Sequence, residues 1–312
     1  GSVIDRKFES TEASAKSDAL KQYAIWGEKS DYLTRPTVNE VKKMDGDFLI
    51  DQIKDAMSVE TTVFYTGTVE KDVVRNSIKE NFMIKDELRE SKSPYRFEKK
   101  LNNSNTIYFH NDKKAVQSQI YIIVDGERMD EGDRHLSNMF NKYFGGSMSG
   151  LVFQEIREFR SLAYSAYGTY RKPFFFDESG RFEGFMGTQA DKTMEAIETY
   201  VNLLKNMPQK ANRLDGIQSG LLESLTSSRS NFRSIGATIR NWGNQGFKED
   251  PKIRQKQVYE SSNFNDIVRF YSNYIEGKPY TIAIVGNKEK IDFDKLSSYG
   301  NIIELKKGDI FN

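Results

Sequence analysis

The chain has 312 residues, enough for one large domain or two ordinary ones, and 46 basic residues balance 45 acidic ones. No apolar run approaches the roughly 18 to 20 residues of a membrane span, and residues 1–10 lack the zones of a signal peptide. We therefore expect a soluble protein with no membrane span and no general attraction to nucleic acid; bacterial cytoplasm and periplasm are both compatible. The absence of cysteine excludes disulfides, thiolate metal sites and cysteine nucleophiles.

Hydrophobic periodicity predicts both helices and strands along the chain. The expected elements are, in order, helices at about 10–26, 48–57 and 70–82, with a strand at 61–66; strands at 95–101, 106–110 and 116–124; a helix at 130–144; a helix at 151–159 and a strand at 163–170; a strand at 181–189; helices at 192–207, within 214–242 and at 264–275; and a last strand at 280–285. Asp45 is placed to cap the helix that carries Phe48, and the charged residues 85–94 are typical of a linker.

The most informative stretch is YFGGSMSGLVFQEIREFRSLAYSAYGTY, residues 143–170. Gly145 and Gly146 permit backbone angles that other residues avoid, so we expect the chain to reverse there. The following helix has its apolar positions at helical spacing, namely Leu151, Val152, Ile156 and Phe159. These features predict a helix–strand unit that contributes to a core.

Two polar side chains of this stretch are candidates for function. Arg157 lies near the end of the helix and Tyr164 near the start of the strand, where a cation and a phenol could converge on a carbonyl or a carboxylate. Strict alternation predicts Tyr164 and Tyr170 on one face of the strand, with Ala163 and Tyr167 on the other.

Other catalytic arrangements find little support. The only histidines are His110 and His135, and neither belongs to an H-x-x-E-H or H-x-x-H pair, so no two-histidine helical zinc site forms locally. His110 fits a strand-end histidine at a turn better than a weak metal ligand. An independent serine hydrolase using Ser147 stays a third hypothesis, although no histidine is well placed to activate it.

An internal repeat indicates the domain organisation. Trp26-Gly27 is followed by a predicted helix from Phe48, and Trp242-Gly243 by one from Phe264, with the same spacing of 22 residues from tryptophan to phenylalanine. We therefore expect residues 1–90 to be the tail of a truncated domain and residues 91–312 a complete second copy. Together with Gly1-Ser2, which resembles a cloning scar, this predicts a fragment of a longer protein.

With these features in place, the chain resembles the pitrilysin-like (M16) zinc peptidases. The resemblance rests on the glycine-rich turn, Arg157-Glu158 and Leu162-Ala163-Tyr164. It implies an α+β fold, an antiparallel-rich sheet packed against helices. Family members enclose and cleave unfolded peptides between two halves, and zinc sits on an H-x-x-E-H helix of the amino-terminal half.

Because this chain lacks that motif, the resemblance implies the non-catalytic carboxy-terminal half, inactive alone and without zinc of its own. Its expected partners are the missing amino-terminal half and a peptide substrate. Arg157 and Tyr164 match the family's arginine and tyrosine that reach the substrate near the scissile bond, which would allow them to hold a peptide carbonyl. Arg160 fits a surface charge better, but it stays open as the partner of Tyr164 instead of Arg157.

The second hypothesis comes from a different class of protein. It is a structural or chaperone-like module that binds extended peptides along an exposed strand edge without hydrolysis. The strand at 181–189 is the expected edge because its glycines weaken it as a buried strand. Its candidate residues are Phe182, Gly184, Phe185 and Gly187.

Overall fold

A mixed six-stranded sheet forms the centre of the protein. The computed structural model describes residues 6, 9–82, 89–90, 98–100, 102–146, 148–158 and 160–312. The strand order is β3-β4-β2-β5-β1-β6, and the strands are β1 (Thr106–Asn111), β2 (Gln117–Arg128), β3 (Ala163–Arg171), β4 (Ser179–Gln189), β5 (Tyr280–Gly286) and β6 (Asn301–Glu304). β3, β4, β2 and β5 pair antiparallel, whereas β1 runs parallel to both β5 and β6. The outer strands are therefore β3 and β6.

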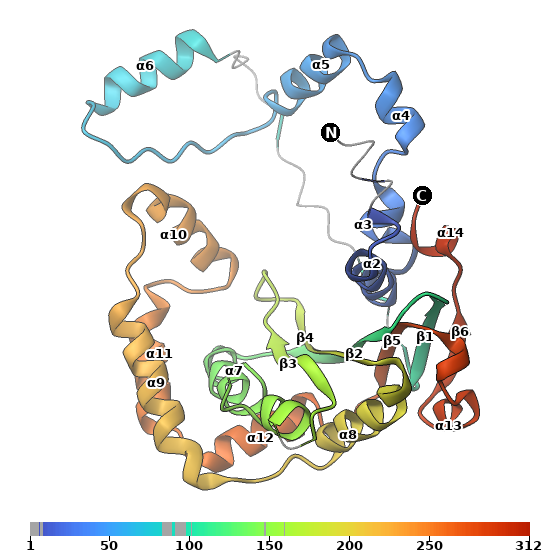
Figure 1. Ribbon diagram of the computed structural model, residues 1–312. Coiled ribbons are helices and arrows are strands. Elements are labelled where there is room, and N and C mark those ends of the chain that lie inside the picture. Colours follow the sequence, from blue (N-terminus) through green and yellow to red (C-terminus); the bar gives the residue numbers. More distant parts are fainter. Residues whose placement is uncertain are drawn as a thin grey trace.

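Helices cover both faces of this sheet (Figure 1). The helices of four residues or more are α2 (Ala13–Trp26), α3 (Asp31–Thr34), α4 (Val38–Lys43), α5 (Gly46–Ala56), α6 (Lys71–Asn81), α7 (Glu131–Phe144), the π-helix η2 (Phe153–Glu158), α8 (Thr193–Lys205), α9 (Leu214–Ser227), α10 (Ile235–Asn244), α11 (Pro251–Ser261), α12 (Phe264–Tyr274), α13 (Phe293–Ser297) and α14 (Lys307–Ile310). α7, α8 and α12 pack on one face and α2 on the other, which confirms the expected α+β fold.

Each face of the sheet has its own hydrophobic core. The larger core joins α7, α8 and α12 to β2, β4 and β5 through fully buried aromatic side chains such as Phe140, Phe182 and Phe270. The smaller core joins α2 to the opposite face, where Leu20 packs with Tyr108 and Phe311. Because α2 belongs to this packed body, residues 13–26 help to fix the sheet. The expected boundary between residues 90 and 91 stays a prediction.

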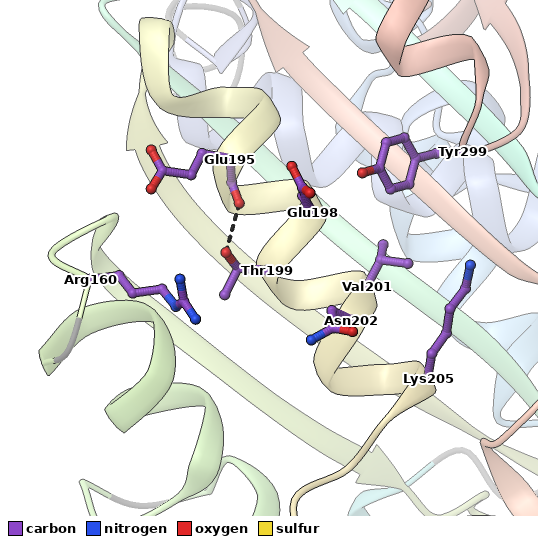
Figure 2. Close-up of a pocket in the computed structure, with 8 residues that line it drawn as sticks. All are labelled: Arg160, Glu195, Glu198, Thr199, Val201, Asn202, Lys205 and Tyr299. Carbon is purple, nitrogen blue, oxygen red and sulfur yellow. Dashed lines mark hydrogen bonds between the residues drawn. The ribbon is translucent and has the colours of Figure 1, made fainter.

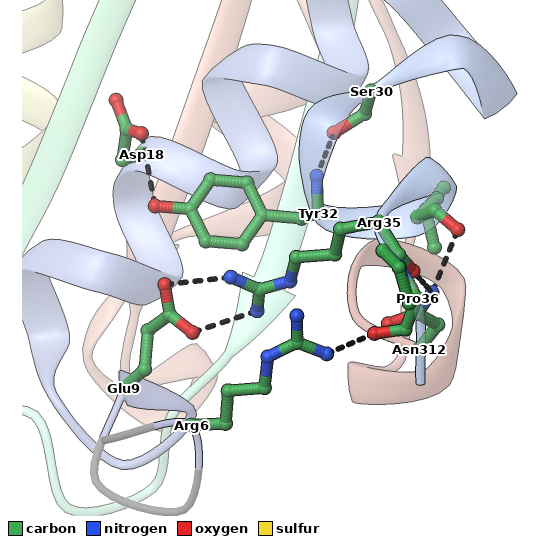
Figure 3. Close-up of polar contacts among 9 residues, drawn as sticks. Arg6, Glu9, Asp18, Ser30, Tyr32, Arg35, Pro36 and Asn312 are labelled. Carbon is green, nitrogen blue, oxygen red and sulfur yellow. Dashed lines mark hydrogen bonds and ion pairs between the residues drawn. The ribbon is translucent and has the colours of Figure 1, made fainter. Parts of the chain in front are cut away.

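Polar contacts attach the segment after α2 to the carboxyl-terminal residues (Figure 3). The Arg35 guanidinium donates to both carboxylate oxygens of Glu9, at 3.0 and 2.7 Å, and the Asn312 amide donates to the Arg35 carbonyl at 2.6 Å. The Tyr32 hydroxyl donates to Asp18 at 3.0 Å, and burial together with that carboxylate raises the pKa of Tyr32. The segment from Tyr32 to Arg35 therefore contacts both Glu9 and the carboxyl-terminal Asn312.

The strand expected at 61–66 is wrong, because the structure shows no strand there. A strand needs a neighbour to satisfy its backbone groups, and none of the described residues pairs with this segment. Instead, the Phe64 ring lies against Gly236 of α10, and the Arg240 guanidinium stands 5.5 Å from its centre. α5 and α6 stand away from the sheet in Figure 1, and neither has a buried residue.

Most of the other expected elements are confirmed. Asp45 caps α5, accepting a hydrogen bond from the Phe48 backbone amide at 2.7 Å. The periodicity missed α11, the short helices α3, α4, α13 and α14, and the short β6. The strand expected at 95–101 falls largely outside the described residues. No described helix combines the length and apolar character that crossing a membrane requires.

Candidate functional site

The helix before β3 is fixed from both sides. Leu151, Val152 and Ile156 are fully buried in the larger core, as their spacing predicted, whereas Phe159 lies outside the described residues. On the outer side, the Lys210 ammonium lies 3.4 Å from the Glu155 carboxylate. These contacts hold the helix that carries Arg157.

A tight turn joins this helix to β3. Ser161 has a φ of 50°, in the left-handed region that commonly ends helices, and its amide donates to the Arg157 carbonyl at 3.0 Å. The Leu162 amide donates to the Ile156 carbonyl at 2.9 Å. Residues after the turn therefore start from a fixed position.

β3 begins with a bulge at Tyr164. Ala163 pairs with Thr188 and Ser165 with Gly187, so two steps on β3 match one step on β4. An extra residue shifts the alternation of side chains, which explains why Tyr164 is 82% exposed while Tyr170 is 1% exposed. The prediction that these two tyrosines share a face is wrong, because strict alternation does not anticipate a bulge.

The role expected for Gly145 also needs correction. Neither Gly145 nor Gly146 has a positive φ. A Cβ atom at Gly145 would stand 2.5 Å from the backbone nitrogen of Gly168, which is closer than side-chain atoms approach. The glycine is therefore required because the end of α7 passes directly against β3.

Arg157 and Tyr164 line one surface pocket of about 440 Å³. The guanidinium carbon of Arg157 lies 5.1 Å from the centre of the Tyr164 ring and 4.7 Å from that of Phe153. This geometry is a cation–π contact, which orients the guanidinium between two aromatic faces. Among the four candidates on β4, Gly187 lines the same pocket.

The donors of Arg157 have little to bind within the described residues. Its Nε lies 3.7 Å from a Glu158 carboxylate oxygen, beyond hydrogen-bond distance, and this is its only ion pair in that part of the chain. The Arg157 side chain is 39% exposed. A planar guanidinium held by rings, with its donors open to solvent, suits a carbonyl or carboxylate acceptor.

Sequence reasoning missed the polar neighbours of this pair. Gln117 of β2 is paired with Gln189 of the neighbouring strand β4, and both line the pocket together with Glu158. Only the strand register brings these side chains beside Arg157, so no local motif signals them. They add amide donors and acceptors to the site.

Arg160, the alternative partner of Tyr164, lies elsewhere. It lines a second pocket together with residues of α8 and Tyr299, as Figure 2 shows. Because Arg157 and Tyr164 share the first pocket, the structure brings together the pair that the resemblance indicated.

The strand expected at 181–189 forms as β4, but it is not an edge. β3 and β2 pair with its two sides, so its backbone groups are not available to a peptide. Phe182 is fully buried, and a Cβ atom at Gly184 would lie 2.3 Å from the Tyr200 hydroxyl. The glycine that suggested a weak edge strand instead makes room for a core tyrosine.

The remaining candidates are accounted for as follows. The His110 ring, near the end of β1, makes a 2.9 Å hydrogen bond with the Leu305 carbonyl. No three or more His, Cys, Asp or Glu side chains gather into a metal site within the described ranges, so these residues do not fit a zinc ion. Ser147 lies outside those ranges.

Comparisons with known proteins agree on one family. Residues 59–221, just over half of the chain, match the family model described as the peptidase M16 inactive domain. YmxG, an uncharacterised zinc protease of Bacillus subtilis, is 29% identical over 121 residues, 37% of this chain and 28% of the relative. SCO5738, an uncharacterised zinc protease of Streptomyces coelicolor, is 24% identical over 181 residues, 56% of this chain and 38% of the relative.

A solved structure matches most of the chain. A peptidase M16 inactive domain from Pseudomonas fluorescens has a TM-score of 0.64 and 13% identity, with 92% of this chain and 68% of that chain covered. The structure thus defines an α+β domain with the fold of this M16 domain. The chain belongs to the peptidase M16 inactive-domain family. It spans well under half the length of the two zinc-protease relatives. These matches support a non-catalytic part of a zinc protease.

Proposed function

We propose that this chain is the substrate-binding, non-catalytic carboxy-terminal half of a zinc endopeptidase that encloses and cleaves unfolded peptides. The observation that carries the proposal is the pairing of Arg157 with Tyr164 in one exposed pocket, with guanidinium donors that the described residues leave open. The catalytic amino-terminal half is the proposed partner, and zinc belongs to that half.

In this proposal Arg157 and Tyr164 bind a carbonyl of the peptide. The Arg157 guanidinium donates one charge-assisted hydrogen bond to the carbonyl oxygen, and the Tyr164 hydroxyl donates a second. Both donors are strongest when negative charge develops on the carbonyl oxygen, so they stabilise the transition state more than the ground state. The aromatic faces beside Arg157 fix its direction before the peptide arrives.

The test combines this chain with its catalytic half and follows hydrolysis of an unstructured peptide. The chain alone with zinc should show no hydrolysis, and the combination should show chelator-sensitive turnover. Arg157→Ala and Tyr164→Phe should each lower turnover by about 10² to 10³, the scale of one oxyanion donor. Lys256→Ala, at an exposed ion pair on α11, is the matched control. Wild-type kinetics in both site variants would remove the assigned role, and turnover by the chain alone would refute the proposal.

The second candidate function is peptide binding at a strand edge without hydrolysis. Because β4 is paired on both sides, the strand that would bind the peptide is the outer strand β3. The outer edge of β3 is already partnered at Tyr170, whose amide donates to the Asn141 side chain at 2.6 Å, and the Gly168 amide faces the Gly145 carbonyl at 3.5 Å. Backbone groups on one edge recur every second residue, so Ala166 presents the next pair, which none of the described residues binds. This leaves a short open edge beside Tyr164.

A peptide-binding measurement on this chain alone, without the catalytic half, separates the two candidate functions. Strand addition requires the amides of the added strand, so an N-methylated peptide should bind worse than its unmodified counterpart. Under the leading proposal, Arg157→Ala should reduce turnover whether or not such binding occurs. Equal affinity for both peptides would exclude the strand-edge module.

A further inference from the structure

A second pocket, of about 530 Å³, lies between the turn at Arg160 and helix α8. Figure 2 shows Arg160 on one side and Lys205 on the other, with Asn202 drawn between them. Tyr299, from the segment before β6, completes the wall. This pocket is separate from the one that holds Arg157 and Tyr164.

Both carboxylates that line this pocket are paired with lysines outside it. Glu195 pairs with Lys192 at 3.3 Å, and Glu198 pairs with Lys295 at 2.8 Å. Each carboxylate therefore already has a cation of its own. Within the part of the chain that the structure describes, Arg160 and Lys205 have no ion pair.

Among the described residues, Lys205 has only a weak contact with an aromatic ring. The Lys205 ammonium lies 5.9 Å from the centre of the Tyr280 ring, at the outer limit of a cation–π contact. The pocket lining thus has two cations and two carboxylates, and both carboxylates are paired with lysines that lie outside the lining, so the unpaired charges are those of Arg160 and Lys205. The pocket therefore attracts an anion.

Hydrogen bonding inside the pocket also favours an acceptor ligand. The side-chain oxygen of Asn202 accepts a hydrogen bond from the side-chain amide of Asn206 at 2.9 Å, so the NH₂ group of Asn202 is left to donate. The Thr199 hydroxyl donates its proton to the Glu195 carbonyl at 2.8 Å. Arg160, Asn202 and Lys205 therefore present donors from separate positions.

We propose that this pocket binds a carboxylate group. The planar Arg160 guanidinium suits two carboxylate oxygens, Lys205 adds a point charge, and the Asn202 amide adds a neutral donor. An acidic side chain of a peptide and a free small carboxylate both carry this chemistry. The site requires no catalytic partner, so its test is independent of the proposed proteolytic function.

Calorimetric titration of this chain at low salt tests the assignment. The ligands are glutarate and a flexible, end-blocked peptide with one glutamate, compared with the same peptide carrying glutamine. Arg160→Gln and Lys205→Gln should each lower the affinity about fivefold or more, as expected for a charge-assisted hydrogen bond. Glu195→Gln should raise it, because it removes a like charge, and Lys256→Gln on α11 should leave it unchanged. Raising the salt to physiological strength should weaken binding.

Each result of the titration supports one ligand class or overturns the proposal. Glutarate binding that depends on Arg160 and Lys205 supports a site for free carboxylates. A preference for the glutamate peptide that the same two variants abolish supports a site for acidic side chains. Absence of binding to either ligand, or equal affinities in wild type and both variants, would overturn the proposal.

Discussion

Acid should destabilise this fold through His135 before most carboxylates titrate. The His135 side chain is 1% exposed, and its ring stacks on Phe247 at 5.3 Å. Burial, and then the positive charges of Lys172, Arg254 and Arg134, lower the pKa of His135 from 6.5 to about 4. The Glu131 carboxylate lies 4.0 Å from its Nε2, but that side chain is 61% exposed and its attraction is screened.

The sign follows from which state binds the proton. Between pH 6.5 and about 4 the unfolded chain protonates this imidazole and the folded chain does not, so stability falls as pH falls. Above pH 6.5 both states hold this imidazole neutral, so its titration costs no stability there. At about 1.4 kcal/mol per pH unit, the loss between pH 7 and pH 5 is about 2 kcal/mol.

Urea unfolding at pH 7, 6 and 5 measures this loss. His135→Phe keeps an aromatic ring against Phe247 but cannot titrate, so its free energy of unfolding should fall by about 2 kcal/mol less than that of the wild type over this range. In the wild type, an NMR titration of the imidazole should show it neutral at pH 5. Parallel pH dependence in the two proteins, or an imidazole that protonates near pH 6.5, would refute the reasoning.

Three further substitutions, one of them with a matched control substitution, test the site and the core. Gly184→Ala should lower the free energy of unfolding by about 1 to 3 kcal/mol, because its Cβ would meet the Tyr200 ring, whereas Gly216→Ala on α9, with no atom within 4 Å, should be neutral or slightly stabilising in the same denaturation assay. Tyr274→Phe removes the 2.8 Å hydrogen bond to buried Asp133 and should lower the free energy of unfolding by about 1 to 2 kcal/mol. A denaturation curve with the midpoint and slope of the wild type would contradict this. Tyr164→Phe should leave the free energy of unfolding within about 0.5 kcal/mol of wild type, because Tyr164 is exposed, so any loss of turnover reflects the hydroxyl and not the fold.

Local patterns predicted the elements well where each element packs on its own apolar face. Leu151, Val152 and Ile156 are buried as their spacing required, and α12 and β5 form close to their expected positions. The prediction failed where the outcome depends on a neighbour. The segment 61–66 has strand composition but no pairing partner, and β4 has the glycines of an edge although it lies inside the sheet.

The candidate site shows the same limit. Sequence alone identified Arg157 and Tyr164 through a family resemblance, but it predicted the wrong face for Tyr164, because the bulge exists only in the pairing of β3 with β4. Gln117 and Gln189 could not be found from the sequence, since they meet across two strands that are far apart in the chain.

The turn between helix and strand explains why two arginines three residues apart serve different pockets. In a regular α-helix, residues three apart lie on one face. Here the helix ends as a π-helix, and Ser161 adopts a left-handed conformation directly after Arg160. Arg157 therefore stays with the aromatic rings of the first pocket, whereas Arg160 lines the pocket on α8. A regular helix end would place both guanidinium groups on one side, so the two pockets would not each have an arginine.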